Sequence, residues 1–288
     1  MPLVAVPTTA GTGSEVGRAA LVTLIVLTFA MGPLRRDWRA IVEGWKMILV
    51  LGLLGVGAFN ALLYSGLRYT TATNALLLQA GIPALVVLWD RLFFGERSAP
   101  VQTLGVGCSI LGVLAIVFDG DPARALQLRF GFGDLLILLS VLVWSLYTVL
   151  LRLRPPISPI SFIAATFLIG VVAMAPLAAH EWLSGERIVW GPRALGAIAY
   201  VAVLPSISAF FMFNYATSTV GAARAGQAIT LMPIFGAFLS AALLGEALQA
   251  HHYAGMALIV AGIGLSITAL RAQQGAGTAG GPPLEHRP

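Results

Sequence analysis

The chain has 288 residues, of which 58% are hydrophobic and only 10% are charged. Soluble proteins carry about 25% charged residues, so this chain has too little polar surface to cover a soluble globule. The net charge of +5 does not indicate nucleic-acid binding, because Arg and Lys lie at the ends of apolar runs and form no basic patch. A single cysteine, Cys108, excludes a disulfide framework and a thiolate metal site.

Residues 1–17 differ from everything that follows, because they are polar and rich in Gly and Thr. The segment PTTAGTGSEV resembles the phosphate loop of iron-containing alcohol dehydrogenases. A Gly-rich run is by itself a weak phosphate signal, and neither a nucleotide-binding βα unit nor a His cluster for iron follows it. We therefore predict a flexible leader, with a membrane-tethered dehydrogenase as a remote alternative.

Nine continuous apolar runs follow the leader, most of them near the length of about 20 residues that crosses a bilayer. They predict an all-α, polytopic transmembrane helical bundle, since a β-barrel would alternate apolar and polar positions. The predicted spans are residues 19–34, 45–67, 71–94, 100–118, 134–152, 160–178, 194–216, 225–244 and 253–270. The Gly- and Pro-rich tail, 271–288, is expected to be disordered.

The basic residues predict the orientation of these spans. If the loop with Arg35 and Arg36 is cytoplasmic, 11 of the 17 Lys and Arg residues lie on the cytoplasmic side and 6 on the other. Because cytoplasmic loops carry the excess of positive charge, the N-terminus is predicted outside and the C-terminus in the cytoplasm. Trp38 and Trp45 lie near span ends, as expected at a membrane interface.

Residue types that are rare in spans recur at one constant offset of 150 residues. The recurring residues are Pro83, Gly95, Glu96, Gly105 and Gly112, which reappear as Pro233, Gly245, Glu246, Gly255 and Gly262. Helix-breaking residues that recur in register indicate one structural unit used twice. We expect a first repeat at 18–118 with four spans and a second at 131–270 with five spans.

The predicted span 134–152 has no partner at this offset, so we expect the first repeat to lack the helix that a complete parent would carry at its N-terminus. Because five spans is an odd number, complete repeats enter the membrane from opposite faces. They would then be related by a two-fold axis in the membrane plane.

Five segments resemble the EamA branch of the drug/metabolite transporter superfamily. They are RRDW at 35–38, YTTATNA at 69–75, LFFGER at 92–97, VWSLYTVLLRLRP at 143–155 and LLGEAL at 243–248. The resemblance extends from about Arg18 to Leu270. It implies two inverted five-helix repeats, a bacterial inner-membrane location, and movement of small organic metabolites without a bound cofactor and without enzymatic activity.

The function implied by this resemblance is secondary transport, commonly export, of small metabolites such as amino acids or related amphiphiles by alternating access. The expected partners are a small-molecule substrate and the lipid bilayer, with no nucleic acid. Two alternatives stay open. One is a truncated or mis-assembled membrane protein that inserts without transporting. The other is a nucleotide-sugar-type carrier, which would need Lys or Arg in its cavity for the phosphates.

Polar side chains inside spans cost free energy unless they have partners, so each is a candidate functional residue. Seven are predicted to face a shared central cavity: Asn60, Tyr64, Gln79, Trp144, Tyr147, Asn214 and Gln227. Asn60 and Tyr64 are four residues apart and share a helix face. The alternative for Asn and Gln is hydrogen bonding between helices, and for Trp144 it is contact with lipid.

The duplicated Pro83 and Pro233 each remove a backbone hydrogen bond, so each predicts either a hinge beside the substrate or a static kink. Glu96 and Glu246 follow Gly at span ends, where they either organise turns or act as gates. No metal site is predicted. Seven glycines of the spans are expected to allow close helix packing rather than phosphate binding: Gly52, Gly55, Gly105, Gly112, Gly255, Gly262 and Gly264.

Overall fold

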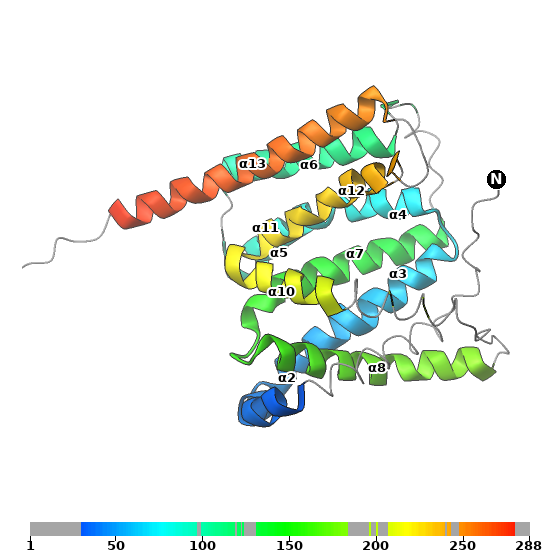
Figure 1. The fold of residues 1–288 in the computed structure, drawn as a ribbon, viewed down its shortest axis with the longest axis vertical. Coiled ribbons are helices and arrows are strands. Elements are labelled where there is room, and N and C mark those ends of the chain that lie inside the picture. The colour runs from blue at the N-terminus through cyan, green and yellow to red at the C-terminus, as the bar shows by residue number, and fades with distance from the viewer. Residues whose placement is uncertain are drawn as a thin grey trace, which may run out of the picture. The chain divides into compact units, whose positions relative to one another are not determined.

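The computed structural model describes residues 30–96, 99–118, 120–121, 123, 131–183, 196, 200, 207–239, 241–242 and 248–279. Within these ranges the chain is helical and has no strand (Figure 1). The predicted leader and Glu246 lie outside the described residues. The all-α fold predicted from the apolar runs is confirmed.

Seven helices in the described part are long and apolar enough to cross a membrane. They are Trp45–Leu67, Asn74–Phe94, Pro100–Val117, Phe132–Leu153, Pro159–Pro176, Ala222–Leu239 and Ala250–Thr268. Each coincides with one of the nine predicted spans. Of the other two, 19–34 lies largely outside the described residues, whereas 194–216 is described at 196, 200 and 207–216, with a helix that begins at Ala209.

The chain divides into two units, and the first contains Met1–Gln79 and Arg129–Ala225. Its described helices are residues 30–43, α2 (Trp45–Gly52), the π-helix η1 (Leu53–Ala58), α3 (Phe59–Leu67), α4 (Ala72–Gln79), α7 (Phe132–Leu150), the short 3₁₀ helix η3 (Leu151–Leu153), α8 (Pro159–Leu183) and α10 (Ala209–Val220). Helix α11 (Ala222–Gln227) begins in this unit and ends in the second.

The second unit contains Ala80–Leu128 and Gly226–Pro288. Its described helices are α5 (Ile82–Phe94), α6 (Pro100–Val117), the 3₁₀ helix η5 (Ala228–Leu231), α12 (Met232–Leu239) and α13 (Ala250–Ala279). The tail was predicted to be disordered from residue 271, but α13 continues to Ala279. Ala272, Gln273 and Gln274, which follow Arg271, are good helix formers that extend the helix past the apolar run, and it continues over Gly275 and Gly277 despite their low helix propensity.

Small residues allow α6 and α13 to pack side by side in the second unit (Figure 1). A Cβ at Gly112 would lie 2.5 Å from the carbonyl oxygen of Gly255, and a Cβ at Gly255 would lie 2.6 Å from that of Gly112. Gly105 and Gly262 meet in the same reciprocal way. The two helices therefore cross antiparallel with their backbones almost in contact.

This crossing is symmetric under the offset of 150 residues found in the sequence. The offset converts the pair Gly105 and Gly262 into the pair Gly255 and Gly112, and both pairs are in close approach. Between them the hydroxyl of Ser109 donates to the carbonyl oxygen of Ile259 at 3.4 Å, a pair separated by 150 residues. Reciprocal contacts of this kind are what a two-fold axis between equivalent surfaces produces.

The duplicated prolines also occupy equivalent positions. Pro83 is the second residue of α5 and Pro233 is the second residue of α12, and both are buried. A proline in the first turn of a helix leaves no hydrogen bond unmade, because the first amides lack partners in any helix. Residues 207–208, which lie 150 positions after 57–58 of η1, share its π-helical geometry.

Glycines also allow the helices of the first unit to approach closely. Gly66 of α3 packs against Ile137 and the carbonyl oxygen of Gly133 in α7, and Gly52 of α2 packs against Ile169 of α8. Of the seven glycines predicted to allow close packing, six meet a neighbouring helix in this way. Gly264 is the exception, since a Cβ there would meet nothing within 4 Å. The prediction was wrong for Gly264 because the hydropathy of an apolar run does not distinguish its inner face from its outer face.

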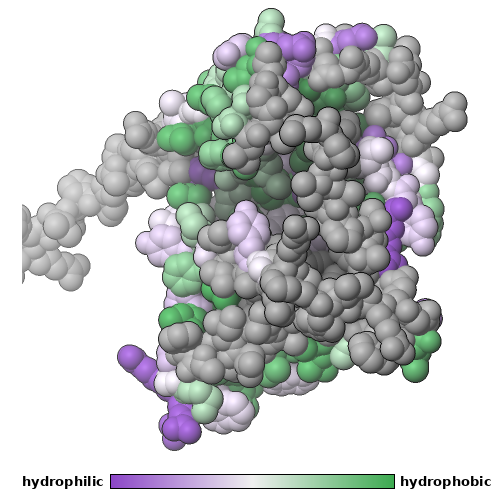
Figure 2. Space-filling view, turned by 45° about the vertical axis from the view of Figure 1, so that its right-hand side comes forward, coloured by the Kyte–Doolittle hydropathy of each residue, from purple (hydrophilic) through white to green (hydrophobic). Residues whose placement is uncertain are grey.

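Many large apolar side chains are exposed, including Leu104 of α6, Phe132 of α7 and Val172 of α8, each 64–66% exposed. Figure 2 shows hydrophobic residues spread over the described surface on the side that it draws. A soluble protein rarely exposes contiguous apolar surface on this scale. These helices therefore present the lipid-compatible faces expected of membrane spans.

Candidate functional site

Two polar side chains from distant parts of the sequence meet inside the first unit. The hydroxyl of Tyr147 on α7 donates to Oδ1 of Asn214 on α10 at 2.8 Å, and the two side chains are 1% and 3% exposed. Nδ2 of Asn214 has no hydrogen-bond partner among the described residues. A buried polar group left without a partner costs about 1–3 kcal/mol, so this amide lowers the stability of the folded chain.

Aromatic rings surround this pair. Trp144, one turn before Tyr147 on α7, is 8% exposed. Its ring centroid lies 4.4 Å from that of Phe59 on α3, 5.1 Å from that of Phe213 on α10 and 5.2 Å from that of Tyr147. Trp144 thus packs within the unit and does not lie against lipid. We call Phe59, Trp144, Tyr147, Phe213 and Asn214 the aromatic–amide cluster.

The π-helix η1 positions the ring of Tyr147. A Cβ at Gly55 would lie 2.5–2.8 Å from three ring carbons of Tyr147, so only glycine leaves room for the ring. On α8, Gly170 leaves equivalent room for Val56. Because π-bulges displace one turn of a helix and are frequent at functional sites, η1 is a local irregularity that shapes this cluster.

The other predicted cavity residues are distributed more widely. Asn60, next to Phe59, donates from Nδ2 to the carbonyl oxygen of Val56 in its own helix at 2.8 Å. Tyr64 and Gln79 are half-buried on α3 and α4. Gln227 belongs to the second unit, where its Nε2 donates to the hydroxyl of Ser109 at 3.0 Å. Of the seven predicted residues, the structure therefore brings together Trp144, Tyr147 and Asn214, with Asn60 adjacent in sequence to their neighbour Phe59.

Glu96 lies in a turn that ends α5. Gly95 has a left-handed φ of 66°, its N–H bonds the carbonyl oxygen of Arg91, and the N–H of Glu96 bonds that of Asp90. This is the hydrogen-bond pattern by which a glycine closes a helix C-terminus. The Glu96 side chain is exposed.

A buried carboxylate that sequence reasoning overlooked lies at the start of α7. Asp134 is 4% exposed and accepts hydrogen bonds from the hydroxyl of Thr70, from Nδ2 of Asn74 at 3.1 Å and from the N–H of Gly131 at 2.7 Å. It therefore ties the beginning of α4 to the beginning of α7. Thr70 and Asn74 belong to the YTTATNA motif. Asp134 was not predicted as a functional residue because it lies at the edge of an apolar run, where an acid is common.

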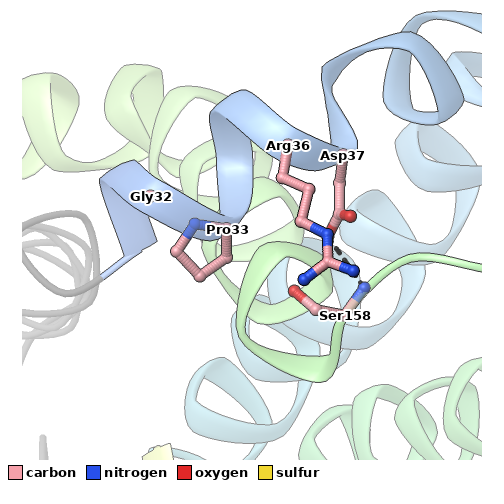
Figure 3. A pocket seen from close by; sticks show the side chains of 5 residues that line it. All are labelled: Gly32, Pro33, Arg36, Asp37 and Ser158. Carbon is pink, nitrogen blue, oxygen red and sulfur yellow. Dashed lines mark hydrogen bonds between the residues drawn. The ribbon is translucent and has the colours of Figure 1, made fainter.

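A second carboxylate lies beside a cavity of about 490 Å³ lined by Gly32, Pro33, Arg36, Asp37 and Ser158. Figure 3 shows Arg36 and Asp37 extending from helix 30–43 toward Ser158, with the hydrogen bond from Ser158 to Asp37 drawn. The backbone N–H of Ser158 donates to Asp37 at 2.9 Å. This bond and the hydroxyls of Ser161 and Ser158 hold the pKa of Asp37 below its usual value of 3.8.

Ser158 also caps α8, since its hydroxyl oxygen accepts the N–H of Ser161 at 3.2 Å and Pro159 opens the helix. A carboxylate beside a helix N-terminus is favoured by the unpaired amides and the helix dipole. Asp37, part of the RRDW motif, therefore joins helix 30–43 to the start of α8. The five lining residues of this cavity lie outside the seven candidate spans.

Comparison with protein families identifies one matching model, described as the EamA-like transporter family. It matches residues 10–118 and 131–268, so the match includes part of the segment predicted to be a leader.

Several curated proteins are similar to this chain. The Uncharacterized transporter YyaM of Bacillus subtilis is 29% identical over 250 residues, which cover 86% of this chain and 80% of that protein. YdfC of the same organism, also named an uncharacterized transporter, is 30% identical over 80% of this chain and 72% of its own length. The "Probable terminal-alkyne amino-acid exporter" of Streptantibioticus cattleyicolor is 26% identical over 84% of this chain and 79% of its own length.

One solved structure, described as "Crystal structure of protein", has a TM-score of 0.71 to this chain at 22% identity. The similarity covers 93% of this chain and 90% of the other. At this level of identity the likeness concerns the fold.

Proposed function

The chain belongs to the EamA-like transporter family, and from this membership we propose that it is a secondary carrier that exports small amphiphilic metabolites such as amino acids. It is a multi-pass membrane protein and its relatives carry the names of transporters, not enzymes. The proposed substrate class agrees with the name of the Streptantibioticus relative, an amino-acid exporter.

The observation that carries the proposal is the aromatic–amide cluster. A polar side chain buried in a membrane span is expensive, so it is retained where it binds a substrate or a partner helix. Here a tyrosine–asparagine pair lies beside a buried tryptophan, and one amide donor has no partner among the described residues. Small-molecule sites are lined mostly by apolar and aromatic side chains with a few polar groups, and the cluster has this composition.

Alternating access requires points in the chain at which helices can move relative to one another. The chain passes from the first unit to the second between Gln79 and Ala80, and again between Ala225 and Gly226. These points lie shortly before Pro83 and Pro233, each of which opens a new helical segment after an irregular turn or a 3₁₀ helix. We propose these two segments as the hinges, with Glu96 and Glu246 at the far ends of the same spans as candidate gates.

The proposed location is the bacterial inner membrane, with the C-terminus in the cytoplasm and the N-terminus outside. The similarity to Bacillus proteins is compatible with this location. Fusions of a reporter that fluoresces only in the cytoplasm to each terminus test the orientation. Fluorescence from an N-terminal fusion would contradict it.

The proposal is tested by counterflow in proteoliposomes. Purified full-length chain is reconstituted into vesicles loaded with a high concentration of unlabelled amino acids, and entry of the same labelled amino acids is measured. We expect transient accumulation of at least one of them in vesicles that contain the chain and none in empty vesicles. Absence of accumulation for the whole panel, with intact helical circular dichroism, would refute the carrier and favour a protein that inserts without transporting.

A variant links the activity to the cluster. Trp144→Ala removes the central ring, and we expect it to reduce the initial rate of counterflow by at least tenfold. Val172→Ala, on an exposed position of α8, controls for general effects of truncating an apolar side chain. Equal rates for the two variants would remove the cluster from the site.

A further inference from the structure

Asn214 presents a hydrogen-bond donor that the fold does not use. Its side chain is 3% exposed, and Nδ2 has no partner within the described part of the chain. Buried polar groups in folded proteins nearly always have partners, so an exception calls for an explanation such as a bound ligand. The exception lies inside the aromatic–amide cluster and not at a helix end or on the surface.

The orientation of this donor is fixed by its neighbour. Because the Tyr147 hydroxyl donates to Oδ1 at 2.8 Å, Nδ2 lies on the other side of the amide. Rotating the amide by half a turn would place Nδ2 beside the Tyr147 hydroxyl. The hydroxyl proton would then lose its acceptor, and Oδ1 would lose its donor. Tyr147 is itself held in place, with its ring against Gly55. The unused donor therefore has a defined direction before any ligand arrives.

The other side chains of the aromatic–amide cluster define the chemistry of a ligand bound at Nδ2. Phe59, Trp144 and Phe213 supply apolar ring faces, and the cluster contains no charged residue. Ring faces bind apolar groups and attract ammonium ions. One cation, Arg154, is close enough to act on Tyr147 electrostatically, and its guanidinium lies 5.9 Å from the centroid of the Phe162 ring. Arg224, the nearest cation to Asn214 along the chain, donates to the carbonyl oxygen of Val220 at 2.8 Å at the end of α10. A neutral donor among rings does not provide the multiple positive charges that a diphosphate requires.

We propose that Nδ2 of Asn214 binds a carboxylate or carbonyl oxygen of the transported molecule, and that Trp144 and its neighbouring rings bind the apolar or ammonium-bearing part beside it. Tyr147 is the positioning residue, because it sets the direction of the amide. This inference rests on the proposed function and specifies its substrate: a small amphiphile with an acceptor oxygen, of which an amino acid with a large apolar side chain is the simplest example.

The test compares acids with their decarboxylated amines. Counterflow in proteoliposomes is measured for L-phenylalanine and 2-phenylethylamine, and for L-leucine and 3-methylbutylamine. These pairs keep the apolar group and the nitrogen but differ in the carboxylate. Wild-type protein is expected to transport at least one acid and to prefer it to its amine by tenfold or more in rate divided by KM. A hydrogen bond to a charged group accounts for a preference of this size, which corresponds to about 1.4 kcal/mol.

Two variants assign the preference to Asn214. Tyr147→Phe keeps the Nδ2 donor, so we expect the preference to fall only in part. Asn214→Leu in the Tyr147→Phe background removes the donor without leaving the tyrosine proton unpaired, and we expect the KM of the acid to rise about tenfold while that of the amine is unchanged. Thr219→Val is the matched control, because Thr219 lies on the same helix, is exposed and bonds its own backbone at Tyr215.

The outcomes separate the two proposals. If neither acid and neither amine moves while other amino acids of the counterflow panel do, the substrate proposed here is overturned; if nothing in the panel moves either, the carrier function itself is refuted. If wild-type protein transports but prefers the amines, or if the double variant keeps the wild-type preference for the acids, the role of Asn214 is overturned while the carrier function stands. A fall in transport of acid and amine by the same factor indicates a structural role, with a bound water satisfying Nδ2, and overturns the proposal as well.

Discussion

The crossing of α6 and α13 allows a prediction whose size follows from the geometry. In Gly112→Ala the new Cβ would lie 2.5 Å from the carbonyl oxygen of Gly255, whereas ordinary contacts of a Cβ begin at 3.4 Å. The helices must therefore separate locally by at least 0.9 Å, the difference of these two distances. Overpacking of this kind costs about 1–3 kcal/mol, with the upper end expected because the opposing atom is backbone and cannot rotate away.

The same two helices provide matched controls. A Cβ at Gly107 of α6 or at Gly264 of α13 meets nothing within 4 Å. Alanine at these positions gains helix propensity, worth up to about 1 kcal/mol in water, without a steric cost. Gly255→Ala, the reciprocal change, should destabilise as much as Gly112→Ala, because its Cβ lies 2.6 Å from the oxygen of Gly112.

The assay is reversible unfolding of purified protein in mixed micelles by increasing mole fraction of sodium dodecyl sulfate, followed by circular dichroism. Gly112→Ala and Gly255→Ala should unfold at a lower mole fraction than wild type, by an amount that corresponds to about 2 kcal/mol. Gly107→Ala and Gly264→Ala should unfold at or above the wild-type value. If all four variants behave alike, α6 and α13 do not cross through these glycines and the reasoning fails.

Three further predictions concern contacts in the first unit, two measured by unfolding and one by counterflow. Asp134→Ala removes the buried carboxylate that accepts three part-buried hydrogen bonds, so the free energy of unfolding should fall by about 1–3 kcal/mol; a change below about 0.5 kcal/mol, roughly the size of a surface substitution, would contradict the role of this link. Because the pKa of Asp37 is lowered from 3.8 in the folded chain, its contribution to stability is fully present above pH 3.8 and is lost as pH falls through the folded value. Wild type and Asp37→Asn should therefore differ most near neutral pH and converge in acid, and a difference independent of pH would exclude this titration. Gly55→Ala should displace the Tyr147 ring and slow counterflow strongly, whereas Gly57→Ala, whose Cβ lies at an ordinary 3.6 Å from Ala173, should not; equal rates would refute the fit of the ring against η1.

The offset of 150 residues is visible in the sequence because proline and glycine are informative where everything else is aliphatic. The offset was found from Pro83 and Pro233 and from the paired glycines, and these residues occupy equivalent places in the structure. What the sequence does not contain is the direction in which each small residue faces. Gly264 lies on the outer face of α13, although it is only two residues after Gly262.

The aromatic–amide cluster could be anticipated from the sequence only in part, for a similar reason. Three of its residues could be identified because a polar side chain inside a span costs free energy and a mid-span Trp or Tyr is not an interface anchor: Trp144, Tyr147 and Asn214. Their pairing joins residues 67 apart, which no local pattern encodes. The rings of Phe59 and Phe213 were not identified, because phenylalanine is equally suited to lipid, as Phe211 with its 39% exposure illustrates. Asp134 was missed because its position at a span edge makes an acid unremarkable until its donors are known.

The reciprocal glycine contacts constrain how this chain can change over generations. A larger side chain at 112 is compensated only by retreat of the backbone at 255, and not at 262, the position that corresponds to 112 in the other copy. Substitutions at these four sites should therefore covary as 112 with 255 and as 105 with 262. Gly105 and Gly112 of α6 each limit the size of the side chain at the partner position on α13, so the two helices can change only together.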